Sequence, residues 1–114
     1  MISANKRREF DERKMACLVD DANTVHMLAA VLPDGRQVAF EYFSLVSAVL
    51  GKDAVYIMCD FNASEMIIAG ENLGQIYNEI CEHRLAKIQV FGNVKELQAG
   101  PKPPPETVTP EKKD

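Results

Sequence analysis

Apolar and polar residues alternate through the middle of the chain in a series of short runs, a pattern typical of β-strands. In residues 25–32 both alternating sets are apolar, so we expect a strand that is covered on two sides. Pro33-Asp34-Gly35 follows as a turn, and residues 36–42 alternate again. The pattern therefore predicts a β-hairpin over residues 25–42.

Further strands are predicted in the next part of the chain. Residues 55–61 alternate, Asn62-Ala63-Ser64 reverses the chain, and residues 66–69 complete a meander. Residues 44–50, which precede them, suit either a strand or one face of a short helix. Their valine content and the neighbouring strands favour a strand.

An amphipathic helix is predicted after these strands. Gly70 breaks the strand pairing, Asn72 is a good N-cap, and Gln75 stands where it would complete a capping box. The apolar residues that follow at helical spacing give a face to lay across the sheet; they are Leu73, Ile76, Tyr77 and Ile80.

The segment after this helix has two possible conformations. Residues 85–91 either continue the helix or form an extended segment, and in both cases Ile88 and Phe91 are expected to be buried.

Composition divides the chain into a charged N-terminal arm (1–14), a single α+β domain (15–92) and a Pro-rich disordered tail (93–114). The tail is predicted because Gly100-Pro101 and the prolines that follow cannot sustain a helix or a central strand. The expected fold class is α+β, with an antiparallel β-meander of four to five strands, one C-terminal helix packed on a face, and flexible termini.

Charge and hydropathy narrow the range of partners. The net charge is −4, and acidic residues interleave with the one basic cluster, Lys6-Arg7-Arg8, so nucleic acid is an unlikely partner. No apolar run approaches the roughly 18 residues that cross a bilayer, and the first 15 residues are too charged for a signal peptide. The expected location is the cytoplasm, without membrane attachment.

The cysteines and histidines do not form a recognisable site. Cys17, Cys59 and Cys81 lack CxxC spacing and are expected to be free thiols that pack as small apolar residues. On a helix, Cys81 and His83 would point about 200° apart, so they cannot act on one atom. His26 could join them only through the fold, and zinc would need further ligands.

Other polar residues also favour ordinary structural roles. The aspartates Asp20-Asp21, Asp53 and Asp60 could act as acids or bind a hard cation, but their positions at strand ends and in turns are typical of solvated carboxylates. Glu82-His83-Arg84 suits the C-terminal end of the helix. We therefore predict no catalytic, cofactor-binding or metal-binding residue, and no cofactor.

The aromatic residues of the strands are expected to pack in the core. A sheet that stacks nucleic-acid bases also presents basic side chains, and Arg36 is the only one on a predicted strand. Core packing is therefore favoured for these residues, which are Tyr42, Phe43, Tyr56 and Phe61.

Several turn and cap signals together resemble a known group of sequences. They are Leu32-Pro33-Asp34-Gly35-Arg36, then Tyr42 and Leu45, then Ile67-Ile68-Ala69-Gly70-Glu71-Asn72-Leu73, and finally Tyr77 and Glu82-His83-Arg84. This stretch is similar to small uncharacterised bacterial proteins that are predicted as a β-meander followed by one helix. The resemblance implies a bacterial, cytoplasmic module, and it brings no activity or functional residue to carry over.

Three functional hypotheses follow. The first is a non-enzymatic protein-interaction or regulatory module that self-associates as a homo-oligomer, such as a dimer. Strands with two apolar faces leave more apolar surface than one helix can cover. The second is a nucleic-acid-binding accessory protein that uses the arm from Lys6 to Lys14. The third is a small ligand-binding protein or enzyme with a pocket between sheet and helix, which would require Cys81, His83, His26 and the aspartates to converge.

Overall fold

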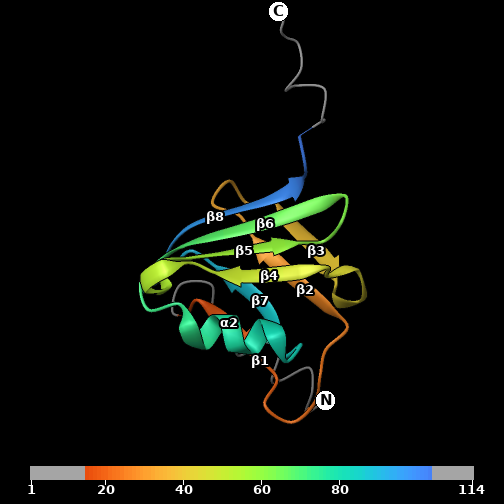
Figure 1. Ribbon diagram of the computed structural model, residues 1–114, viewed down its shortest axis with the longest axis horizontal. Coiled ribbons are helices and arrows are strands. Elements are labelled where there is room, and N and C mark those ends of the chain that lie inside the picture. The colour runs from red at the N-terminus through yellow and green to blue at the C-terminus, as the bar shows by residue number, and fades with distance from the viewer. Residues whose placement is uncertain (1–14, 104–114) are drawn as a thin grey trace, which may run out of the picture.

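The computed structural model describes residues 15–103, which form eight strands and one α-helix (Figure 1). The predicted N-terminal arm (1–14) and residues 104–114 of the predicted tail lie outside the described residues. Sheet A contains, in spatial order, β1 (Cys17–Val19), β7 (Leu85–Gln89), β2 (Met27–Val31) and β3 (Gln37–Glu41). Sheet B contains β4 (Ser47–Leu50), β5 (Tyr56–Asp60), β6 (Ser64–Gly70) and β8 (Val94–Pro101).

The predicted first hairpin is confirmed, because β2 and β3 pair antiparallel in sheet A. In its turn the Gly35 amide donates to the Leu32 carbonyl at 2.9 Å, and the Leu32 amide donates to the Arg36 carbonyl at 2.8 Å. Gly35 has a φ of +96°, which lies in the left-handed region that glycine tolerates best. The Pro33-Asp34-Gly35 signal therefore predicted the turn correctly.

Residues 85–91 adopt the extended alternative. β7 pairs antiparallel with β1 and parallel with β2, so it lies between two strands of sheet A. Ile88 is buried as predicted, but the predicted burial of Phe91 is wrong, since its side chain is 40% exposed. Phe91 stands beyond the end of β7, in a reversal where its amide donates to the Val94 carbonyl at 3.1 Å.

Sheet B is antiparallel throughout, and it includes residues that were predicted to be a disordered tail. The strand prediction for residues 44–50 is confirmed over Ser47–Leu50, after a 3-10 turn at Tyr42–Ser44. The tail prediction from residue 93 is wrong for β8, which pairs with β6 from Val94 to Pro101.

The position of β8 explains how it accommodates a proline. It is an edge strand, and the amide of Lys102 donates to the Ala63 carbonyl at 3.0 Å. Backbone groups alternate in direction along a strand, so the nitrogen of the preceding residue, Pro101, faces away from β6. Proline therefore removes no bond from this ladder.

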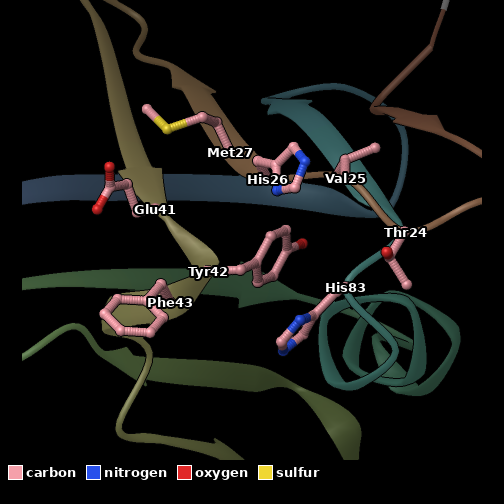
Figure 2. A pocket seen from close by; sticks show the side chains of 8 residues that line it. All are labelled: Thr24, Val25, His26, Met27, Glu41, Tyr42, Phe43 and His83. Carbon is pink, nitrogen blue, oxygen red and sulfur yellow. The ribbon is translucent and has the colours of Figure 1, made fainter.

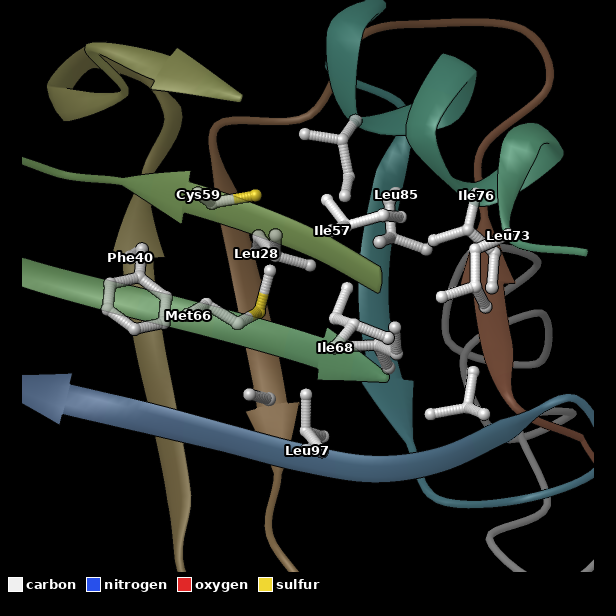
Figure 3. Close-up of a cluster of buried hydrophobic side chains, with 14 of the residues drawn as sticks. Leu28, Phe40, Ile57, Cys59, Met66, Ile68, Leu73, Ile76, Leu85 and Leu97 are labelled. Carbon is white, nitrogen blue, oxygen red and sulfur yellow. The ribbon is translucent and has the colours of Figure 1, made fainter. Parts of the chain in front are cut away.

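The two sheets pack face to face with their strands crossed, and one apolar core lies between them (Figures 1 and 3). Sheet A contributes Leu28 and Ile88 to this core, and sheet B contributes Ile57 and Ile68, all with no exposed surface. The α+β class is thus correct, whereas the single meander is wrong. The chain leaves sheet A through the 3-10 turn at Tyr42–Ser44 and enters sheet B at β4.

The helix α2 (Gly74–Cys81) contacts β4 of sheet B and β7 of sheet A, so it closes one side of the space between the sheets (Figure 1). Of its predicted apolar positions, Leu73, Ile76 and Ile80 are buried, and Tyr77 is partly buried against the same core. No helix within residues 15–103 is long and apolar enough to cross a membrane.

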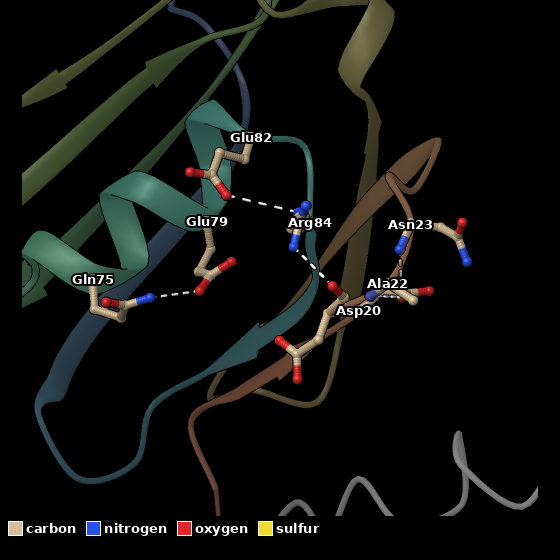
Figure 4. Close-up of polar contacts among 8 residues, drawn as sticks. Asp20, Ala22, Asn23, Gln75, Glu79, Glu82 and Arg84 are labelled. Carbon is tan, nitrogen blue, oxygen red and sulfur yellow. Dashed lines mark hydrogen bonds and ion pairs between the residues drawn. The ribbon is translucent and has the colours of Figure 1, made fainter.

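The predicted N-cap of this helix is wrong. Leu73 takes the N-cap position without a side-chain hydrogen bond, and Asn72 precedes it with a left-handed φ of +51°. The Gln75 side chain donates to the Glu79 carboxylate one turn later instead of completing a capping box (Figure 4).

Replacing Leu97 by alanine tests whether β8 belongs to the folded unit. Leu97 is buried, so we expect Leu97→Ala to lower the free energy of unfolding by about 2–5 kcal/mol, as for other buried leucines. Urea unfolding followed by circular dichroism measures this change. Gln98→Ala, at an exposed position of the same strand, should change stability by less than about 0.5 kcal/mol. Equal effects of the two substitutions would mean that β8 is not packed.

The ion pair between Asp60 and Lys102 predicts a pH dependence of stability. Its N–O distance is 2.7 Å, and the hydrogen bond from Lys102, with a second from the Asn62 amide, holds the pKa of the Asp60 carboxyl below its usual value. A lowered pKa stabilises the folded protein above the unfolded pKa of about 3.9, and this contribution disappears as the pH falls through the folded pKa.

We therefore expect Asp60→Asn to flatten the loss of stability below about pH 4, as measured by thermal unfolding across pH. Lys102→Gln should reproduce part of this flattening, because it removes the largest cause of the lowered pKa. Profiles of both variants that parallel the wild-type profile would contradict the assignment.

Candidate functional site

Both histidines line one open hollow of about 600 Å³ on the surface (Figure 2). The hollow lies where the chain enters β2, where β3 ends, and where the chain leaves α2. We call it the histidine hollow; its lining residues are Thr24, Val25, His26, Met27, Glu41, Tyr42, Phe43 and His83.

Main-chain hydrogen bonds hold the three segments of the hollow together. The Tyr42 amide donates to the His26 carbonyl at 3.0 Å, and the Val25 amide donates to the His83 carbonyl at 2.8 Å. The position of each histidine therefore follows from backbone pairing and does not depend on the imidazole rings themselves.

His83 reaches the hollow because of how α2 ends. The Arg84 amide donates to the Glu79 carbonyl and the His83 amide to the Ile80 carbonyl, the two bonds of a Schellman cap. His83 occupies the left-handed position of this cap, with a φ of +60°, where glycine is usual. The cap thus turns the chain back towards Tyr42.

The predicted capping role of Glu82-His83-Arg84 is therefore carried mainly by backbone groups. The Arg84 guanidinium instead reaches across to the segment after β1, where Nη1 donates to the Asp21 carbonyl at 2.8 Å. It also lies 3.7 Å from the Glu82 carboxylate (Figure 4). Arg84 thereby ties the end of the helix to the first strand of sheet A.

Tyr42 forms the rigid base of the hollow. Its ring stacks on the His83 ring with centroids 4.5 Å apart and planes inclined by 17°. Its hydroxyl donates to the Leu85 carbonyl at 2.7 Å, and burial raises the pKa of the phenol far above its ordinary value. The phenol is therefore protonated and committed to a structural hydrogen bond, so it is not available for acid–base chemistry.

Phe43 is held out of the protein beside this base. The 3-10 turn, in which the Leu45 amide donates to the Tyr42 carbonyl at 3.0 Å, buries Tyr42 and leaves the Phe43 side chain 96% exposed. Exposing a phenylalanine forgoes roughly 1.5–3 kcal/mol of burial energy. The alternating pattern predicted core packing for both aromatics, and this prediction is wrong for Phe43.

The structure brings His26 and His83 to one hollow but does not add a cysteine to them. Cys17 and Cys59 are largely removed from solvent, and this desolvation raises the pKa of each thiol to about 12. Thiols with such values are poor nucleophiles, because the thiolate is the reactive form. Cys81 is exposed on α2 and is not among the residues that line the hollow.

The aspartates are scattered over separate turns. The Asp20 carboxylate accepts from the Ala22 and Asn23 amides at 2.9 and 3.0 Å (Figure 4). Asp53 lies in the turn after β4, and Asp60 pairs with Lys102. Within residues 15–103 no group of three or more histidine, cysteine or acidic side chains is placed to hold a metal ion.

The predicted strand aromatics do not share one surface. Tyr42 and Phe61 are buried, and the Phe61 ring stacks on Phe40 with centroids 4.3 Å apart, so the core prediction holds for these two. The core prediction is wrong for Tyr56, which is 40% exposed on sheet B and does not line the hollow. Arg36, the basic residue considered beside them, pairs with Asp34 in the hairpin turn at 2.9 Å.

Comparison of the chain with protein-family models, with curated proteins and with solved structures found no match. The resemblance to small bacterial proteins therefore stays a prediction.

Proposed function

We propose that the protein is a non-enzymatic interaction module that self-associates through the surface formed by Phe43 and the histidine hollow. The observation that carries this proposal is the 96% exposure of Phe43, which lines a concave surface together with the apolar residues Val25 and Met27. An exposed aromatic side chain on a fixed turn is a common anchor of protein interfaces.

The arrangement suits a second copy of the same chain. A two-fold dimer needs one patch that is complementary to itself, so that residue i meets j while j meets i. Here the exposed Phe43 is itself one of the residues that line the hollow (Figure 2). A two-fold axis beside Phe43 inserts each Phe43 into the partner's hollow, where Val25 and Met27 supply apolar contact.

The energy of such an exchange is sufficient for a reversible dimer. Burying one phenylalanine side chain contributes roughly 1.5–3 kcal/mol, and symmetry doubles this contribution. Val46, which is 66% exposed three residues after Phe43, adds apolar surface to the same connection. The contact closes on itself and leaves no unsatisfied copy of the patch, so it does not extend into a filament.

The chemistry of the side chains supports binding over catalysis. Tyr42 donates its hydroxyl to a backbone carbonyl, and burial keeps the thiols of Cys17 and Cys59 protonated near neutral pH. All three cysteines are free, which suits a reducing compartment, so the cytoplasm is the proposed location.

Sedimentation equilibrium of the full chain over a range of concentrations tests the proposal. We expect a reversible monomer–dimer equilibrium that Phe43→Ser weakens at least about tenfold, because two buried rings are lost from each dimer. Val55→Ser is the control, since Val55 is an apolar residue that is 44% exposed and does not line the hollow. It should leave the equilibrium unchanged.

Circular dichroism should report the same fold for both variants, because surface substitutions change stability by less than about 0.5 kcal/mol. A wild-type protein that remains monomeric at every concentration would overturn the proposal. So would equal dimerisation of the wild type and Phe43→Ser.

A further inference from the structure

A second apolar surface lies on the outer face of sheet B, away from the shared core. Strand alternation places Ile57, Cys59, Met66 and Ile68 inwards, where they are buried, so their neighbours along β5 and β6 point outwards. Register then aligns Val49 with Met58 and Met58 with Ile67 in one row across three strands.

This row is accessible to a partner. Val49 is 48% exposed and Met58 is 43% exposed, although both occupy strands of a paired sheet. Tyr56 and Ala69 form a second pair on the same face, adjacent to the row. The outer face of sheet B therefore has an apolar centre.

Carboxylates stand at both ends of this centre. Asp60 and Glu65 are directly opposite each other in the β5–β6 ladder. Glu96 pairs with Ala69 at the other end. Lys102 neutralises only Asp60, and neither Glu65 nor Glu96 makes an ion pair within the described residues.

We propose that the outer face of sheet B binds a basic amphipathic helix of a partner protein. The backbone groups of the inner strands β5 and β6 are used in their ladders, so a partner must bind there through side chains and not by adding a strand. A helix provides a continuous apolar stripe for this purpose.

The dimensions and charges agree with a short helix. Tyr56 and Asp60 are four residues apart on β5, which is about 13 Å along the strand and equals roughly nine residues of helix. Lysine or arginine residues at the two ends of the partner's stripe would meet the carboxylates of Asp60, Glu65 and Glu96. An apolar centre with a charged rim is the usual anatomy of an interface.

This surface is separate from the one proposed for self-association, since neither Phe43 nor the histidine hollow belongs to it. The protein would thus join two copies of itself and present one helix-binding face on each copy. Separate variants, Phe43→Ser and Met58→Ser, therefore test the two surfaces one at a time.

Fluorescence anisotropy with a labelled amphipathic peptide tests the inference on the full chain. The probe is a leucine–lysine helix of about 18 residues with leucines on one face. We expect saturable binding that weakens as salt rises, and that Met58→Ser weakens about tenfold by removing buried apolar area. The Phe43→Ser variant, which changes an exposed apolar residue on the other surface, should bind the peptide like the wild type.

Two matched peptides separate the apolar and charged contributions. A peptide of the same composition with leucines spread around the helix, and a leucine–glutamate helix, should both bind at least about tenfold more weakly. Glu65→Gln should weaken binding of the leucine–lysine helix without loss of folding, because the amide has the same shape as the half-buried carboxylate. Equal affinity of Met58→Ser and wild type, or equal binding of all three peptides, would overturn the inference.

Discussion

The fold depends on one constraint: a sheet buries an apolar face only by packing it against another element. In this protein the inner faces of the two sheets bury each other. Leu28 and Ile88 from sheet A pack with Ile57 and Ile68 from sheet B in a single core (Figure 3). A four-stranded sheet alone would leave such residues in water. The helix α2 adds Ile76 and Ile80 at one side of this core, so it completes the enclosure instead of roofing either sheet.

The same constraint decides which surfaces a partner can reach. Because the inner faces of the two sheets are buried, only the outer faces and the loops between strands are accessible. Tyr42 is the link between core and surface. Its hydroxyl bonds to the start of β7, its ring supports His83, and its burial forces Phe43 outwards. The acidic, apolar outer face of sheet B arises separately, from strand alternation. Both proposed interaction surfaces are thus direct products of how the core is built.

Local signals predicted the hairpin at Pro33-Asp34-Gly35 and the buried face of α2, since turn chemistry and helical spacing act over a few residues. The division into two sheets could not be predicted, because alternation is the same in one meander or two. Pro101 concealed β8, as a sequence does not reveal which strand lies at an edge. The site was missed for similar reasons: nothing local separates Tyr42 from Phe43, or indicates that His83 would take a position that glycine usually fills.

Native-state hydrogen exchange tests most directly whether the two sheets form one cooperative unit around a shared core. The amides of Ala30 and Ile88 in sheet A and of Ile57 and Ile68 in sheet B should exchange with the same free energy and the same urea dependence, because neither sheet can open alone. Exchange from one sheet at a distinctly lower free energy, with the other still protected, would contradict a single core.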